Sequence, residues 1–188
     1  MPTNLIGAAA AIKTLPVNKV FILDQTNPEL KSFPALYQNH QKDIYNCLLL
    51  GKNKLNKYQN LILIFPGFRE PLGMKIGFEN FCTDFEFQYE VITEFKNREI
   101  KKGEIYIIPN DRDLVKVIEK SKNQNLNIGS DFGVISYNET PLKKIVENGI
   151  TTISTNFELM GKILAQMILR NLHDQIENKC HLIIRNSL

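Results

Sequence analysis

Short apolar runs alternate along the chain with longer segments in which apolar residues recur every three or four positions. The short runs are typical of buried strands, and the three-to-four spacing is typical of helices that cover a core. We therefore expect strands over residues 17–23, 35–37, 61–65, 89–95, 104–108, 133–136, 150–154 and 181–185. We expect helices over residues 42–57, 71–85, 110–127, 140–148 and 156–172.

This alternation of strands and helices predicts an α/β fold with a doubly wound parallel sheet and right-handed crossovers. Three of the helices have an apolar stripe that should face the core. The stripes are Met74, Phe78, Phe81, Cys82 and Phe85 in the helix 71–85, Leu114, Val115, Val117 and Ile118 in the helix 110–127, and Met160, Ile163, Leu164, Met167, Ile168 and Leu172 in the helix 156–172.

Polar side chains follow several of the predicted strands at the point where each strand ends. The carboxyl ends of parallel strands form the edge of an α/β sheet at which small molecules bind. The candidate ligand-binding residues at these ends are Asp24, Asn39, Asn110 and Asn138, with Phe65 and Phe68 as a wall for the apolar face of a sugar ring. Simpler roles remain open, because Asn110 can cap a helix, Asn138 can form a turn and Phe65 can pack in the core.

Composition suits one globular domain or two small lobes, with 188 residues, 43% of them apolar and 23% charged. The apolar runs are too short to cross a bilayer. The run 5–12 resembles a secretion signal, but no Lys or Arg precedes it and no small-residue cleavage site follows it. We therefore expect a cytoplasmic protein that has no contact with a membrane.

Catalytic, metal and nucleic-acid motifs are missing from the sequence. The chain has no G-x-S-x-G elbow, no P-loop and no G-x-G-x-x-G fingerprint. Its three cysteines and three histidines do not have zinc-ligand spacing, and Cys47 and Cys82 fall on apolar helix faces. The formal charge of +3 is scattered and forms no basic helix. We expect no enzymatic activity, no cofactor, no metal and no DNA binding by this chain alone.

Six short motifs, in order and at matching spacing, resemble the sensor domain of lac-repressor-type (LacI/GalR) transcription factors. They are Pro16 with Asp24, Gly77-Phe78, Asn110-Asp111, Tyr137-Asn138-Glu139, GITTIS at 149–154 and FELMG at 157–161. Some regulators join this sensor to a GntR-type winged-helix DNA-binding domain, and the chain is most similar to that subgroup. The resemblance implies a periplasmic-binding-protein-like type I fold and a small effector bound between two lobes.

Two departures from the family pattern affect the expected ligand. Met74 stands where the family's signature arginine would be, and neither Arg69 nor Lys75 occupies that position. Asn138 replaces the first aspartate of the family's Asp-Asp pair. Because an amide both donates and accepts hydrogen bonds, Asn110 and Asn138 favour a neutral sugar or polyol as the ligand.

The resemblance also implies how the chain is divided. Residues 1–39 and 154–179 would form part of an N-terminal lobe, and residues 40–153 and 180–188 the C-terminal lobe. The start of the family's first lobe and the DNA-binding domain have no counterpart here, so we expect a truncated sensor.

The resemblance implies that the chain senses a small, sugar-like effector to control DNA binding by a separate domain, and that the protein is a homodimer. The alternative is a periplasmic sugar-binding protein of a transporter, which shares the fold.

Overall fold

The computed structural model describes residues 6–25, 27–67, 70–96 and 98–188. The chain divides into two compact units. The larger unit comprises His40–Ser154 and Cys180–Leu188, and the smaller unit comprises Met1–Asn39 and Thr155–Lys179.

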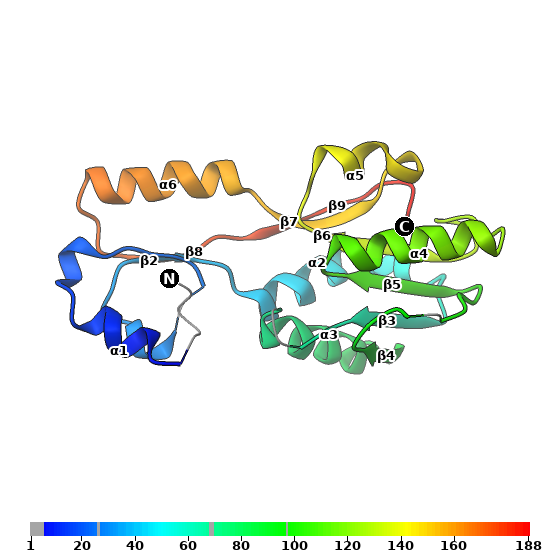
Figure 1. Cartoon of the computed structure of the whole chain (residues 1–188), viewed down its shortest axis with the longest axis horizontal. Helices are drawn as coiled ribbons and strands as arrows, with labels where there is room; N and C mark the ends of the chain where they lie inside the picture. The colour runs from blue at the N-terminus through cyan, green and yellow to red at the C-terminus, as the bar shows by residue number, and fades with distance from the viewer. Residues whose placement is uncertain (1–5, 26, 68–69, 97) are drawn as a thin grey trace. The chain divides into compact units, whose positions relative to one another are not determined.

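The larger unit is built on a six-stranded sheet with the order β4-β3-β5-β6-β7-β9 (Figure 1). Each neighbouring pair from β4 through β7 is parallel. The strands are β3 (Asn60–Ile64), β4 (Gln88–Ile92), β5 (Glu104–Ile108), β6 (Gly133–Tyr137), β7 (Thr151–Thr155) and β9 (Cys180–Ile183). The predicted α/β fold with a mainly parallel sheet is confirmed.

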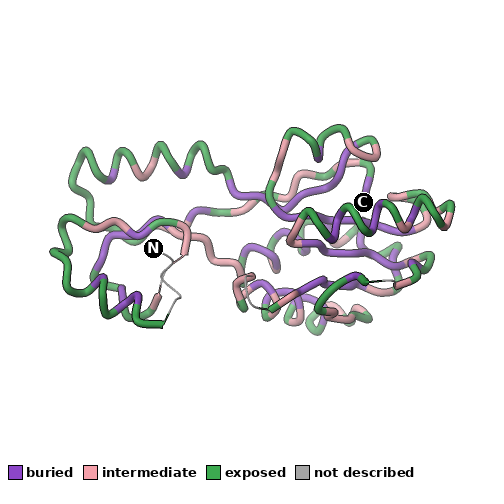
Figure 2. Tube along the Cα trace, viewed as in Figure 1, coloured by how far each residue is buried: buried purple, intermediate pink, exposed green. Residues whose placement is uncertain are grey.

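Helices cover both faces of this sheet. Along β3, Leu61 and Leu63 pack with α2 (His40–Leu55) and α3 (Leu72–Asp84), whereas Ile62 and Ile64 pack with α4 (Asp111–Asn123). Alternate residues of a strand point to opposite faces, so a continuous apolar run is needed where both faces are covered. Figure 2 shows the resulting pattern, in which the central strands are buried and the outward helix faces are exposed.

Gly77 allows α3 to lie close to α2. A Cβ at this position would be 2.2 Å from the carbonyl oxygen of Gln41 and 2.6 Å from Cγ2 of Ile44. Beside it, Phe78 is fully buried in the core. The Gly77-Phe78 motif is therefore explained by packing between two helices, with the small residue at the crossing and the large one directed into the core.

The smaller unit has a three-stranded parallel sheet with the order β1-β2-β8. Its strands are β1 (Ile22–Asp24), β2 (Ala35–Tyr37) and β8 (Gln175–Glu177), and its α-helices are α1 (Ala8–Lys13) and α6 (Phe157–Leu169). Short 3-10 turns occur at η1 (Val17–Lys19) and η2 (Pro28–Leu30). The sequence patterns did not predict α1 or β8, because a six-residue helix and a three-residue strand carry too few positions to show a period.

Three predictions about the bounds and burial of helices and strands were wrong in detail. The segment predicted as a strand over 17–23 begins as η1, in which the Lys19 amide donates to the Pro16 carbonyl. Helix α6 ends at Leu169, because Asn171 adopts a left-handed conformation with φ 51°. The predicted apolar stripes are also only partly buried: Val115 and Ile168 are each 52% exposed.

Candidate functional site

A hollow of about 650 Å³ lies at the carboxyl ends of β3, β4 and β5 in the larger unit. The segments that follow these three strands, together with the first turns of α4, provide its lining. The lining residues are Pro66, Glu70, Thr93, Glu94, Asn110, Asp111, Arg112, Asp113 and Lys116. This is the edge at which the sequence predicted ligand binding, and the lining is polar and charged, so the hollow suits a polar ligand.

Asn110 both caps α4 and lines this hollow. Its side-chain oxygen accepts a hydrogen bond from the Asp113 amide at 2.9 Å, and its Nδ2 donates to Oδ2 of Asp113, also at 2.9 Å. A primary amide has two N–H groups and two acceptor lone pairs. One donor and one acceptor site of Asn110 therefore remain for a ligand, and the capping and ligand-binding roles are compatible.

Two substitutions of Asn110 separate these roles. We expect Asn110→Ala to lower the free energy of unfolding by about 0.5–2 kcal/mol, because the first turn of α4 loses its cap. Asn110→Ser retains a capping oxygen and should stay close to the unsubstituted chain in stability, although it removes the amide that would contact a ligand. Urea denaturation measures both changes. Equal stability of the alanine and serine variants would contradict the capping role.

Asn138 follows β6 directly and has left-handed backbone geometry, with φ 59°. Its backbone amide donates to the Ile153 carbonyl at 2.9 Å, which holds the turn against β7. The residue is exposed, and its side-chain amide makes no hydrogen bond to the part of the chain that the structure describes. Asn138 is thus a fixed turn residue with an amide available to a ligand.

Asn138 is not among the residues that line the hollow, although it follows β6, the strand next to β5. The other predicted ligand residues lie elsewhere. Phe65 is 6% exposed and packs in the core of the larger unit, which is the simpler of its two predicted roles. In the smaller unit, Asp24 accepts a hydrogen bond from Nε2 of Gln38, and Asn39 donates to Glu177 at 3.2 Å. Ligand contact by these residues stays a prediction. Phe68 and Arg69 lie outside the described residues.

Most carboxylates of the hollow are paired with lysines. Glu94 lies 2.8 Å from Lys96, and Asp113 lies 3.2 Å from Lys116. The Asp111 carboxylate lies 2.8 Å from the buried Nζ of Lys143, a residue that no sequence pattern indicated. This pairing lowers the net charge that a ligand would meet.

Glu70 differs from these carboxylates, because its Oε2 is buried without a hydrogen-bond partner among the described residues. Such an acceptor is suited to a ligand hydroxyl or amine. The described ranges contain no group of three or more His, Cys, Asp or Glu that could hold a metal ion.

Glu139 has a structural role beside the site. Nη1 and Nη2 of Arg185 donate to its two carboxylate oxygens at 2.9 and 2.7 Å, and Oγ1 of Thr152 donates at 2.5 Å. Partial burial alone raises the pKa of Glu139, but the hydrogen bonds from Arg185 and Thr152 outweigh it and hold the pKa below its ordinary value. The carboxylate therefore ties the β6 turn to the C-terminal segment.

The lowered pKa predicts a pH-dependent contribution to stability. A carboxyl whose pKa is lower in the folded state stabilises the fold above its unfolded pKa of about 4.3, and this contribution is lost as the pH falls through the folded pKa. Glu139→Gln should therefore reduce the loss of unfolding free energy between pH 6 and pH 3, measured by urea denaturation. Glu119→Gln, an exposed change on α4, is the control and should leave that loss unchanged. An unaltered pH profile in the Glu139 variant would refute the assignment.

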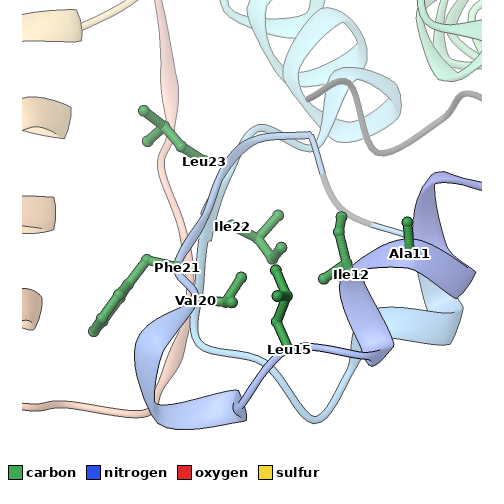
Figure 3. A pocket seen from close by; sticks show the side chains of 7 residues that line it. All are labelled: Ala11, Ile12, Leu15, Val20, Phe21, Ile22 and Leu23. Carbon is green, nitrogen blue, oxygen red and sulfur yellow. The ribbon is translucent and has the colours of Figure 1, made fainter.

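A second hollow, of about 350 Å³, lies in the smaller unit. Figure 3 shows the side chains of Ile12, Leu15 and Ile22 converging between α1 and β1. All seven lining side chains are apolar, so they offer no hydrogen bond to orient a polar ligand. The polar hollow of the larger unit is the better candidate site. In the described part of the chain, no helix is both long and apolar enough to span a membrane.

Comparison with solved structures shows similar folds in transcription regulators. A transcription regulator-like protein from Staphylococcus haemolyticus has a TM-score of 0.70 at 14% identity, with 89% of this chain and 65% of that chain covered. The lac repressor bound to ONPG has a TM-score of 0.71 at 16% identity, with 97% and 60% covered. This chain thus spans less than two thirds of the length of either protein.

A third structure carries a bound sugar: a periplasmic binding protein/LacI transcriptional regulator from Alkaliphilus metalliredigens, complexed with D-xylulofuranose. Its TM-score is 0.68 at 12% identity, with 89% of this chain and 70% of that chain covered. No curated protein sequence matches the chain.

The profile of the periplasmic binding protein-like domain matches residues 83–188, which include β5, β6, β7 and the first turns of α4. The matched segment therefore carries Asn110, Asn138 and the turns around them. It covers more than half of the 188 residues. The predicted resemblance to lac-repressor-type sensor domains is confirmed for the fold, and the chain belongs to the family of periplasmic binding protein-like domains.

Proposed function

We propose that this chain is the effector-sensing part of a bacterial transcription regulator and that it binds a small, uncharged, sugar-like molecule. The effector would occupy the hollow at the carboxyl ends of β3, β4 and β5. The observation that carries the proposal is the position of Asn110, which caps α4 and still presents one amide donor at this edge. Carboxyl edges of parallel strands are the usual ligand sites of open α/β sheets.

The chemistry of the hollow supports an uncharged polyol as the ligand. Glu94, Asp111 and Asp113 each have a lysine partner, so a cationic ligand would compete with a lysine at three of the four carboxylates of the hollow, all except Glu70. The amide of Asn110, which lines the hollow, and that of Asn138, which follows the neighbouring strand β6, can each donate to and accept from a hydroxyl group. The similar protein from Alkaliphilus metalliredigens has D-xylulofuranose bound, which is a ligand of this type.

The proposal extends to the protein in which the chain would act. Binding of the effector would alter the affinity of a separate, GntR-type winged-helix domain for DNA, in a cytoplasmic homodimer. Such coupling requires that the effector bind more tightly to one conformation of the regulator than to another. The protein would have no enzymatic activity, because the proposed role uses binding energy alone.

The first experiment is a calorimetric titration of the chain with a panel of neutral pentoses, hexoses and polyols. We expect saturable binding of at least one compound and weaker binding of it by Asn110→Ser, which keeps the helix cap. Binding that is equally tight in this variant would place the ligand elsewhere. Absence of binding across the panel would contradict a neutral sugar as effector.

A periplasmic sugar-binding protein of a transporter is the competing function, since the family name covers such proteins. Both functions predict that this chain binds a sugar, but they predict different coding sequence upstream of it. Reading the coding sequence upstream of Met1 separates them: a basic winged-helix segment supports the regulator, and a cleavable signal peptide supports the transporter protein.

A further inference from the structure

Lys143 is a buried lysine in the short helix α5 (Pro141–Ile145), and its ammonium group is fully used within the protein. Its side chain is 4% exposed. Nζ donates to the carbonyl oxygen of Tyr137 at 2.5 Å and to that of Asn138 at 2.9 Å, and it lies 2.8 Å from Oδ1 of Asp111. An ammonium group has three N–H donors. Three acceptors therefore match three donors, which is the condition under which a buried charge is tolerated.

These three partners belong to two different turns at the carboxyl edge of the sheet, of which the turn with Asp111 lines the hollow. Tyr137 ends β6 and Asn138 follows it, whereas Asp111 is the first residue of α4 and lines the hollow. Strands β5 and β6 are neighbours in the sheet, so their carboxyl-end turns lie next to each other. Lys143 connects the turn that carries Asn138 with the turn that carries Asn110.

The Lys143–Asp111 pair is asymmetric in exposure, and this asymmetry determines its effect on the hollow. The Asp111 side chain is 66% exposed, whereas its lysine partner is almost completely buried. An exposed carboxylate with an exposed partner would be held weakly. Here the lysine is fixed by two backbone carbonyls, so Asp111 is held at the hollow by an immobile cation that also offsets its charge.

We propose that Lys143 is a positioning residue of the ligand site: it holds the Asn110 and Asn138 turns in one arrangement and neutralises Asp111, which lowers the affinity of the site for an amine relative to an uncharged ligand. That Lys143 holds the two turns together rests on geometry alone. The preference for an uncharged ligand rests also on the proposed function.

Neighbouring residues supply matched controls. Lys144 is the adjacent residue, is exposed and carries the same charge. Comparing Lys143→Met with Lys144→Met therefore separates the effect of the buried contacts from the effect of removing a positive charge. Lys143→Met leaves two carbonyl groups without their donor and can destabilise the turn. Asp111→Asn avoids this problem, because it changes only the exposed end of the pair. Arg112→Met controls for removing a charge beside Asp111, since Arg112 is exposed and lines the same hollow.

The first test needs no ligand. Backbone and side-chain amide resonances of Asn110 and Asn138 are recorded by ¹⁵N–¹H correlation spectroscopy for the unsubstituted chain and the variants. We expect Asp111→Asn to shift the resonances of Asn138, although Asn138 lies in the other turn. Arg112→Met should leave the Asn138 resonances in place. Lys143→Met should shift both asparagines, and Lys144→Met neither. Unchanged Asn138 resonances in Asp111→Asn, or equal shifts in Arg112→Met, would overturn the proposal.

The second test uses D-glucose and D-glucosamine, which differ by a hydroxyl and an ammonium group on the same ring. Lys143→Met should move the ratio of the two affinities toward glucosamine by about tenfold, and adding Asp111→Asn should reverse that change. A purely structural role would leave the ratio unaltered in both variants, and this result would overturn the charge role. Binding of neither sugar to any variant would count against the proposed function, while the resonance shifts would still decide whether Lys143 joins the two turns.

Discussion

Replacing Phe78 with alanine is expected to lower the free energy of unfolding of the larger unit by about 3–5 kcal/mol, the cost typical of removing a buried phenyl ring. Phe78 is fully buried in the core that α2 and α3 form with β3, β5 and β6. It also makes an edge-to-face contact with Tyr89, at a centroid distance of 5.8 Å. The crossing of α2 and α3 at Gly77 leaves little freedom for the helices to collapse into the cavity.

Hydrogen exchange of the β3 and β5 amides measures this change in the larger unit specifically, and urea denaturation gives the matching global value. Val115→Ala, at a 52% exposed position on α4, is the control and should change stability by no more than about 0.5 kcal/mol. Similar losses in the two variants would show that Phe78 is not the core residue that the packing indicates.

Removing the side chain of Asn138 is expected to weaken effector binding by about 1–3 kcal/mol, because hydroxyl groups of the bound ligand lose a partner away from water. Asn138→Gly is the sharper form of this change. The backbone has φ 59° here, a conformation that costs an alanine roughly 1–2 kcal/mol and that glycine adopts freely. Asn138→Ala would therefore mix backbone strain with the loss of the amide.

Asn148 provides a matched control, since it is also exposed and has the same φ of 59°. It precedes β7, so it lies at the opposite end of a strand from the candidate site. Calorimetry should give unchanged affinity for Asn148→Gly and a reduced affinity for Asn138→Gly. If both variants bind as tightly as the unsubstituted chain, the Asn138 amide does not contact the ligand.

The sequence predicted the fold well where elements are long and buried. The strand over 104–108 and the core residues Met74, Phe78, Phe81 and Cys82 of α3 are as predicted, because their apolar period is unbroken and both sheet faces are covered. Short elements such as α1 and β8 were missed, because they have too few residues to show an apolar period. The strand predicted over 17–23 was wrong at its start, where a turn after Pro16 outweighs the apolar run.

The candidate site was predictable only in part. Asn110 and Asn138 follow strands at the predicted edge, because polar residues after apolar runs have a fixed place in a parallel sheet. Asn110 lines the hollow, and ligand contact by either residue stays a prediction. Lys143 was missed because sequence alone does not distinguish it from Lys144, and only the fold buries one and exposes the other. The pairing of Glu139 with Arg185 joins residues 46 positions apart, which no local pattern indicates.

The central claim is that a small neutral effector binds at the carboxyl edge of the six-stranded sheet. The most direct test is to map the amide resonances that move when a sugar identified by calorimetry is titrated into the chain. We predict saturable shifts at Asn110, Asp111 and Asn138, with the same dissociation constant as the calorimetric titration. Saturable shifts confined to the apolar hollow of the smaller unit, or to the amino ends of the strands, would contradict this account.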